Sequence, residues 1–444
     1  MNVSGTALTM RTSLNVTRSI SMPMSMLVRI ATAIALTLVT SIAFSYPLYG
    51  SDDRKIGRLE AARLKHEGVI PGRKKVSGEL LSLEEVDLRL LAHSDMDLPT
   101  VDKKFSGQLR KLLSHNPSDY GLAVLDLSDP AAIRYGEHGA SVPRNPGSVG
   151  KIAVGLALFQ SLADIYPDDV DKRMALLRDT NVTADEFIIS DSHTVRMWNP
   201  ETRKLTRRPL RVGDQASLIV FVDWMLSASS NAAAAMVMRE TMLLKQFGTQ
   251  YPLSVERSAA FFADTKKTDL KQLLETTLQG SMTRNGIDTT QFRQGSLFTR
   301  TGKRKVPGTN SYATARELMR FMLRMEQGRL VDEWSSRELK RFLYMTERRI
   351  RYASSPALRK SAVYFKSGSW YGCKPEVGFK CGKYRGNKRN LMNSIAIVES
   401  PANERNLFYL VALTSNVLRK NSAVDHQTLA TRIHRLIEKT HKAQ

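Results

Sequence analysis

The order of apolar and polar positions along residues 102–444 predicts strands near both ends and helices between them. The apolar runs YGLAVLDL (120–127) and AAIRY (131–135) flank a turn and predict two paired strands. Residues 422–442 carry apolar positions at helical spacing and predict a closing amphipathic helix. Before that helix, three apolar runs predict strands over 362–369, 391–399 and 407–414. We therefore expect one five-stranded antiparallel sheet that joins both ends of this region.

The middle of the chain has mainly helical periodicity. A break at residues 143–147 precedes an apolar helix over 148–163, and a second apolar helix is predicted over 216–238. The polar stretch WNPETRKLTRR interrupts this pattern and predicts a surface hairpin. The pattern favours the α/β (α+β) class: a five-stranded antiparallel sheet flanked by helices, with an inserted all-helical lobe over about residues 164–345. A site is expected in the cleft between the two.

The N-terminal residues have the pattern of an export signal. Residues 1–29 contain three arginines and no acidic residue, and residues 30–51 carry no charge. Small residues at Ala43 and Ser45 favour a cleaved signal peptide, and an uncleaved signal anchor is the alternative. We expect residues 1–51 to direct the chain to the periplasm or another extracytoplasmic space. The charged, weakly patterned residues 52–101 predict a linker or stalk before a folded domain at 102–444.

Charge and cysteine content narrow the function classes. The net charge is +23, which calls for an anionic partner, and export argues against nucleic acid. Residues 348–389 hold twelve basic residues and one acidic residue, Glu376. This run predicts an electropositive rim for an anionic cell-wall polymer or a membrane surface, with a merely solvated face as the alternative. Two cysteines exclude a cysteine-built zinc finger, and we expect neither a metal nor a cofactor.

Three short motifs carry the candidate chemistry. Ser148 and Lys151 form S-x-x-K at the start of the apolar helix, where a spacing of three places both side chains on one face. A lysine with a lowered pKa can take the proton of a serine nucleophile. Ser229 and Asn231 follow in a run of small residues, where Asn231 alone is equally consistent with an ordinary helix cap. Lys366 begins K-S-G-S on a predicted strand, so that it shares a face with the glycine two residues on.

In this order and on these elements, the motifs resemble those of the serine β-lactamase and penicillin-binding protein superfamily, in its class A β-lactamase-like branch. The resemblance covers about residues 102–444. It implies that Ser148 is acylated by a β-lactam or by a D-Ala-D-Ala-type peptide of peptidoglycan, with Lys151 as its base. It also implies that Ser229 passes a proton to the leaving nitrogen and that Asn231 holds the substrate amide.

The resemblance assigns the K-S-G-S strand to substrate binding. Lys366 would bind the substrate carboxylate and also assist Ser229. Ser367 and Gly368 would take part in substrate binding. The backbone amides of Ser148 and Ser369 would form the oxyanion hole. Arg385 and Arg389 are candidates for the arginine that often supports the substrate carboxylate in this family.

One part of the class A pattern is missing. Those enzymes place a glutamate in the loop before the helix that TARELM begins here, where it activates the deacylating water. In this chain, no acidic residue follows Asp288 until Glu317. The sequence therefore predicts slow release of a β-lactam acyl group. Cys373 and Cys381, with seven residues between them just beyond the K-S-G-S strand, are expected to form a disulfide rather than free thiols.

These features leave three functions open. The first is an exported serine hydrolase that forms an acyl-enzyme with a β-lactam or a cell-wall peptide. The second is an efficient β-lactamase that uses a non-standard deacylation base. The third is a catalytically weak protein that binds or senses cell-wall material through the same pocket.

Overall fold

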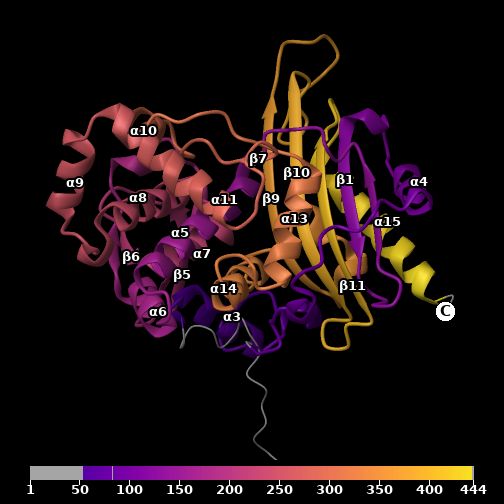
Figure 1. Cartoon of the computed structure of the whole chain (residues 1–444), viewed down its shortest axis with the longest axis horizontal. Helices are drawn as coiled ribbons and strands as arrows, with labels where there is room; N and C mark the ends of the chain where they lie inside the picture. The colour runs from indigo at the N-terminus through magenta and orange to yellow at the C-terminus, as the bar shows by residue number, and fades with distance from the viewer. Residues whose placement is uncertain (1–53, 83, 443–444) are drawn as a thin grey trace, which may run out of the picture. The chain divides into compact units, whose positions relative to one another are not determined.

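The computed structural model of the protein describes residues 54–82 and 84–442. Five antiparallel strands form its central sheet in the order β2-β1-β11-β10-β9 (Figure 1). The strands are β1 (Tyr120–Asp126), β2 (Arg134–His138), β9 (Ala362–Gly372), β10 (Arg389–Ser400) and β11 (Leu407–Asn416). The predicted five-stranded antiparallel sheet, built from both ends of the region, is confirmed.

Strand β2 begins three residues later than the sequence predicts. The Asp129 carboxylate accepts a hydrogen bond from the Ala131 backbone amide at 2.9 Å, which closes a turn over the residues expected to start the strand. An aspartate that bonds to the backbone two residues ahead competes with strand pairing. The turn therefore takes residues whose apolar side chains suggested a strand.

Helices cover both faces of the sheet. α15 (Ser422–Lys442) and α4 (Lys103–Lys111) pack on one face, where Leu429 and Ile433 of α15 meet strand residues such as Val411 in a buried apolar cluster. α13 (Ala315–Glu326) and α14 (Glu333–Tyr344) lie against the other face and connect it to the helical lobe (Figure 1). The bounds of α15 match the sequence prediction, because its apolar stripe is long and regular.

The helical lobe is built around α5 (Lys151–Ile165). The other helices of this lobe are α6 (Val170–Asp179), α7 (Leu218–Leu226), α8 (Asn231–Phe247), α9 (Val255–Asp264), α10 (Lys267–Glu275), α11 (Ser281–Arg284) and α12 (Arg300–Lys305). Among the described residues, only the helical stretch Gly147–Ile165 is long and apolar enough to cross a membrane, and most of it is buried inside the protein. It is the core helix of the lobe.

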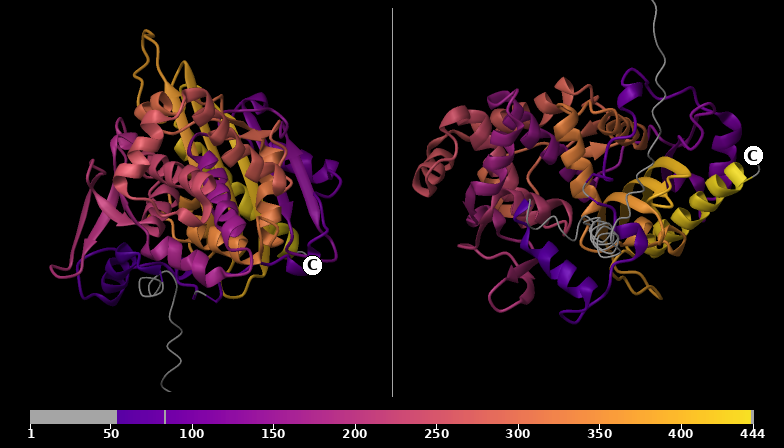
Figure 2. Two further views of the ribbon diagram at one scale, coloured as in Figure 1. Left: turned by 60° about the vertical axis from the view of Figure 1, so that its left-hand side comes forward. Right: turned by 90° about the horizontal axis from the view of Figure 1, so that it is seen from below.

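The lobe also contains short strands, so the expectation that it is all-helical needs correction. β4 (Thr194–Asn199) and β5 (Lys204–Pro209) form the hairpin predicted from WNPETRKLTRR, and this hairpin projects from the lobe (Figure 2). The other two pairs are β3 (Asn181–Thr183) with β6 (Gln215–Ser217), and β7 (Phe292–Arg293) with β8 (Tyr312–Ala313). Strands of two or three residues are too short to leave a period in the sequence.

The described part of residues 54–101 packs on the folded domain, whereas the sequence predicts a helical linker or stalk before it. α3 (Gly57–Glu67) buries Ile56 and Leu59 at its start, both at most 1% exposed, and the buried Arg58 guanidinium pairs with the buried Asp223 carboxylate. The described residues accordingly form one compact unit. The sequence did not reveal this packing because many of its contacts are ion pairs. Charged residues in such contacts give the segment a weak apolar periodicity.

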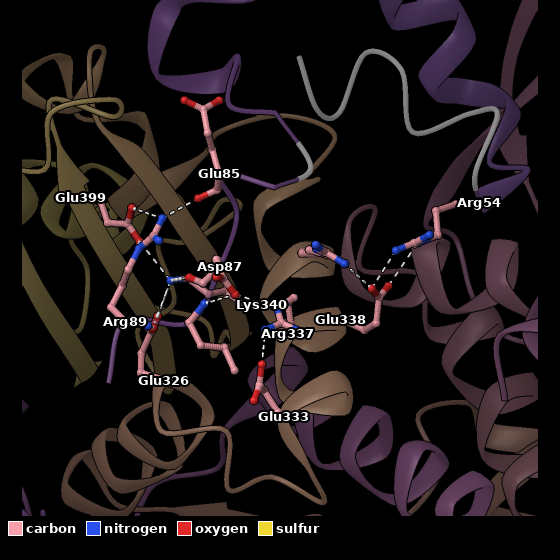
Figure 3. Close-up of polar contacts among 12 residues, drawn as sticks. Arg54, Glu85, Asp87, Arg89, Glu326, Glu333, Arg337, Glu338, Lys340 and Glu399 are labelled. Atoms are coloured by element: carbon pink, nitrogen blue, oxygen red, sulfur yellow. Dashed lines mark hydrogen bonds and ion pairs between the residues drawn. The ribbon is translucent and has the colours of Figure 1, made fainter. Parts of the chain in front are cut away.

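Figure 3 shows a second docking point of this segment, a cluster of ion pairs under the sheet. Arg89 lies 3.1 Å from the Glu399 carboxylate at the end of β10. Lys340, on α14, is fully buried between Glu399 at 2.9 Å and Glu326 at 2.7 Å. These ion pairs join the segment to the sheet and to α14. Removing one partner would leave an uncompensated buried charge, so the contacts are costly to break. The predicted export signal at residues 1–51 lies outside the described residues.

Candidate active site

Ser148 lies in a tight turn that the backbone holds directly in front of α5. The turn is a 3₁₀ helix over Gly147–Gly150, and Gly147 adopts a φ of 54°, a left-handed conformation that favours glycine. The Asn145 side chain accepts a hydrogen bond from the Gly147 amide at 2.9 Å and donates one to the Ser311 carbonyl at 3.1 Å. These contacts fix the serine at the amino end of the core helix, as the S-x-x-K motif predicts.

Lys151 is within hydrogen-bond distance of this serine. Its ammonium nitrogen lies 3.1 Å from Ser148 Oγ, 2.6 Å from the Ser229 carbonyl oxygen and 2.7 Å from Asn231 Oδ1. The side chain is completely buried, and burial lowers the pKa of Lys151 to about 7, with the attraction of Asp191 opposing the shift. Near neutral pH a substantial fraction of this lysine is therefore uncharged and able to accept a proton from Ser148.

The turn that carries Ser229 interrupts what the sequence predicts as one helix over 216–238. α7 ends at Leu226 and α8 begins at Asn231. Ser229 has a φ of 64°, which is strained for a residue with a side chain, and Ser230 caps α8 by accepting a hydrogen bond from the Ala233 amide at 3.1 Å. The prediction of one continuous helix was wrong because the apolar periodicity continues on both sides of the turn. The break projects Ser229 and Asn231 toward Lys151.

Asp191 braces this turn, and sequence reasoning missed it. One of its carboxylate oxygens accepts hydrogen bonds from Ser230 Oγ at 3.1 Å and from the Asn231 and Ala232 amides at 2.8 Å each. His193 lies 2.6 Å from the other oxygen. Burial raises the pKa of Asp191, but His193 and the α8 amides outweigh it and lower the value to about 2. The acid therefore stays ionised and serves as a cap for α8 rather than as a proton acceptor.

Lys366 approaches the same turn from the sheet. It lies on β9, and its ammonium nitrogen is 2.8 Å from Ser229 Oγ. Burial, together with the positive charges of Lys151 and Arg351, brings the pKa of Lys366 well below its usual range. An anion placed beside Lys366 would reverse this shift by stabilising the ammonium form. The structure thus brings together Ser148, Lys151, Ser229, Asn231 and Lys366, as the three motifs predict.

Gly368 allows β9 to touch the nucleophile turn. A methyl group on Gly368 would collide with the Pro146 carbonyl oxygen and lie 2.5 Å from the Ser148 amide nitrogen. A methyl group on Gly147 would lie 3.1 Å from the Ser369 amide nitrogen. The two glycines let the backbones of the turn and the strand meet, which brings the amides of Ser148 and Ser369 to the same place.

The arginine beside the K-S-G-S strand is Arg351, which sequence reasoning did not identify. Its guanidinium donates to Ser367 Oγ at 2.7 Å, to Ser369 Oγ at 3.1 Å and to the Tyr384 hydroxyl at 3.1 Å.

The two arginines expected near the substrate carboxylate make other contacts. Arg389 stacks on Trp370, 3.4 Å from the ring centroid, and Arg385 lies 6.0 Å from the Phe379 ring. The structure therefore has Arg351, rather than Arg385 or Arg389, in contact with Ser367 and Ser369. An arginine ahead of β9 in a basic run carries no signal that distinguishes it in the sequence.

Comparison with known proteins covers part of this arrangement. Residues 270–434 match the sequence profile of the β-lactamase enzyme family. This part of the chain is therefore β-lactamase-like. The matched residues include Lys366–Ser369, whereas Ser148, Lys151 and Ser229 lie before them. No curated protein matches the chain.

Several solved structures are similar to the chain at low identity. One is a structure of PBP-A, with 14% identity and a TM-score of 0.48 over 77% of this chain and 100% of that chain. Another is a β-lactamase from Chitinophaga pinensis, with 15% identity and a TM-score of 0.48 over 76% and 98% of the two chains. A class A β-lactamase described as the last common ancestor of Gram-negative bacteria has 18% identity and a TM-score of 0.46 over 76% and 98%.

In this β-lactamase-like site, the loop before α13 presents no carboxylate to Lys151. The ring of Phe298 lies 4.8 Å from the lysine nitrogen instead. Asp288 is occupied by the Thr290 hydroxyl at 2.6 Å, and Glu317 binds the Asp288 amide at 2.8 Å and Arg320 at 2.7 Å. Both acids that border the loop are thus engaged in contacts within the loop and α13.

The predicted disulfide is present between Cys373 and Cys381, whose Cα atoms are 6.2 Å apart. It closes part of the β9–β10 connection, which extends past the end of the sheet in Figure 1. Lys380, Lys383 and Arg385 are exposed on this connection. The basic run is nevertheless not one rim, because Arg349 is partly buried against backbone carbonyls, whereas Arg359 and Lys360 lie before the other end of β9.

Proposed function

We propose that the protein is an exported serine hydrolase that forms an acyl-enzyme on Ser148 with a β-lactam or a D-Ala-D-Ala-type peptide and releases the acyl group slowly. The observation that carries this proposal is the contact between Ser148 Oγ and the buried Lys151, whose pKa is lowered to about 7. The match of residues 270–434 to the β-lactamase enzyme family supports the reaction class.

The acylation step follows from the contacts in the site. Uncharged Lys151 takes the proton of Ser148 Oγ as this oxygen bonds to the substrate carbonyl carbon. The backbone amides of Ser148 and Ser369 stabilise the resulting oxyanion. The carbon–nitrogen bond then breaks as Ser229 gives its proton to the leaving nitrogen, and Lys366, 2.8 Å from Ser229 Oγ, supplies the replacement proton.

Residues of β9 and of the turn at Ser229 bind the substrate from either side. Asn231 holds the substrate amide, and Lys366 with Ser367 and Arg351 binds its carboxylate. The substrate carboxylate stabilises the ammonium form of Lys366, which burial disfavours in the free protein. Binding of a carboxylate substrate therefore prepares Lys366 for proton transfer.

Slow deacylation is proposed from the surroundings of Lys151. Hydrolysis of an acyl-enzyme needs a base that activates water, and the loop before α13 offers Phe298 at this place. The ionised Asp191 is a poor substitute, since its carboxylate is saturated by Ser230, two backbone amides and His193. This arrangement favours a penicillin-binding hydrolase over an efficient β-lactamase.

Labelling with a fluorescent penicillin tests the proposal. The intact protein is expected to become labelled and to keep the label, whereas Ser148→Ala remains unlabelled. The exposed Ser141 offers the matched control, because Ser141→Ala removes the same hydroxyl outside the site. Absence of label on the intact protein would overturn acyl-enzyme formation, and rapid loss of label with hydrolysed drug would identify an efficient β-lactamase instead.

Export and an anionic wall partner complete the proposal. The uncharged residues 30–51 and the disulfide Cys373–Cys381 support an extracytoplasmic location. The exposed Lys380, Lys383 and Arg385 support binding of an anionic cell-wall polymer beside the site. If reversing these three charges leaves cell-wall binding and its salt dependence unchanged, the polymer does not bind there.

A further inference from the structure

A cavity of about 940 Å³ lies below the sheet, away from Ser148. It is enclosed by residues 75–77, by the segment that leads into β9, by the β10–β11 connection and by the last turns of α15. β9 begins at Ala362, which pairs with Glu399 at the end of β10, whereas the opposite end of this strand pair joins Gly372 to Arg389. Four residues of strand, about 13 Å, separate Ala362 from Lys366. The cavity is therefore distinct from the candidate active site.

Positive side chains dominate the wall of this cavity. Four cationic side chains face one carboxylate, Glu438, and two imidazoles complete the polar lining. The cations are Lys75, Arg359, Lys360 and Lys442, and the imidazoles are His434 and His441. Such an excess of one sign in a concave site focuses the field on an anion.

Much of this charge is not neutralised inside the protein. Within residues 54–82 and 84–442, the exposed side chains of Arg359 and Lys360 form no hydrogen bond or ion pair. Lys75 is largely buried and lies 3.2 Å from Glu79, its counter-ion. Burial lowers the pKa of Lys75, with Glu79 opposing that shift, so a second anion nearby would further stabilise its charged form.

The two imidazoles and the carboxylate are already engaged. His434 Nδ1 lies 2.9 Å from the Tyr409 hydroxyl, and its other nitrogen faces Glu438 at 3.7 Å. His441 lies 2.9 Å from the Asp126 carboxylate. Glu438 is thus directed to His434, and the cations of the opposite wall remain available to a ligand.

The rest of the wall is apolar, which points to a ligand with a carbon body. The apolar lining residues are Val76, Pro356, Ala357, Pro401 and Leu407. The volume falls in the range of about 300–1,000 Å³ that suits small organic ligands. A guanidinium binds a phosphate through two parallel hydrogen bonds, and a doubly charged group engages several cations at once.

We propose that this cavity binds an organic phosphate, with its phosphate between Arg359, Lys360 and Lys75 and its carbon body against Val76, Pro401 and Leu407. The phosphate belongs either to a soluble metabolite-sized molecule or to the headgroup of an anionic lipid. Both sources share the chemistry that the wall recognises. The proposal does not depend on acyl-enzyme formation at Ser148.

The test is calorimetric titration of the full chain with glycerol 3-phosphate and with inorganic phosphate, together with co-sedimentation on phosphatidylcholine vesicles with and without phosphatidylglycerol. The double variant Arg359→Gln/Lys360→Gln removes two charges from exposed positions, and thermal unfolding checks its fold. The exposed pair Lys103 and Lys104 on α4 gives the matched control, Lys103→Gln/Lys104→Gln, with the same change of net charge.

We expect the cavity variant to weaken binding about tenfold, since two charge-assisted contacts are lost, and the control variant to bind like the unaltered protein. Tenfold weaker binding of glycerol 3-phosphate identifies a soluble ligand, and a loss confined to phosphatidylglycerol vesicles identifies a lipid headgroup. Equal weakening in both variants, unchanged binding in the cavity variant, or no binding of any probe overturns the proposal.

Discussion

The pH dependence of acylation should report the titration of Lys151. Only the uncharged amine can take the proton of Ser148, and burial lowers the pKa of this lysine to about 7. At pH 6 about one-tenth of the free protein then has an uncharged Lys151, and at pH 8 about nine-tenths. The second-order rate constant of acylation should therefore rise about tenfold over this interval and level off above it.

The assay is stopped-flow or gel-based labelling with a fluorescent penicillin at limiting drug, because the second-order constant reports the pKa values of the free enzyme. Lys151→Arg should abolish labelling at every pH in the range, since a guanidinium does not lose its proton there. Circular dichroism of this variant separates the loss of a base from a loss of fold. The neighbouring charges that act on the profile are those of Asp191 and Lys366.

A second variant tests the direction in which Asp191 shifts the pKa of Lys151. The Asp191 carboxylate attracts the Lys151 ammonium and raises its pKa against the effect of burial. Asp191→Asn removes this attraction, so the midpoint of the rising limb should move to lower pH. A rate that is independent of pH between about pH 5.5 and 8.5, or a midpoint that moves to higher pH in Asp191→Asn, would refute the assignment of Lys151 as the base.

Three further substitutions test the site. Asp191→Ala leaves the capped amides of α8 and the Ser230 hydroxyl unpaired, and should lower the free energy of unfolding by about 1–3 kcal/mol in chemical denaturation; an unchanged midpoint of denaturation would contradict this role. Gly368→Ala forces a methyl group against the Pro146 carbonyl, and should cost about 1–3 kcal/mol of stability together with most of the penicillin labelling. Phe298→Glu places a carboxylate near Lys151 and should shorten the lifetime of the acyl-enzyme by about 10²-fold, measured as loss of label; a lifetime equal to that of Phe298→Gln would show that the missing acid does not limit deacylation.

Periodic elements of this protein follow from its sequence with little error. The strands β1, β9, β10 and β11 and the helix α15 lie where alternation and helical spacing place them. These elements are long and sit in the core, so their apolar positions repeat for many residues. The spacing within S-x-x-K and K-S-G-S is equally local. It predicted the contact between Ser148 and Lys151 and the shared strand face of Lys366 and Gly368.

Contacts that join distant segments were beyond such reasoning. Asp191 reaches Asn231 across 40 residues of sequence, and Arg351 reaches Tyr384 across 33. Neither belongs to a repeating pattern, and each was one charged residue among many. The break before α8 was also hidden, because the turn at Ser229 lies between two helices with the same apolar character.

The sequence by itself therefore determined the sheet, the closing helix, the three motifs and the lack of an acid between Asp288 and Glu317. The tertiary structure decided which charges act together. It placed Asp191 under the Ser229 turn and divided the basic run between the two ends of β9. The physical reason is range: periodicity and motif spacing record contacts within an element, whereas pKa values and ion pairing depend on which side chains folding brings within a few ångströms of one another.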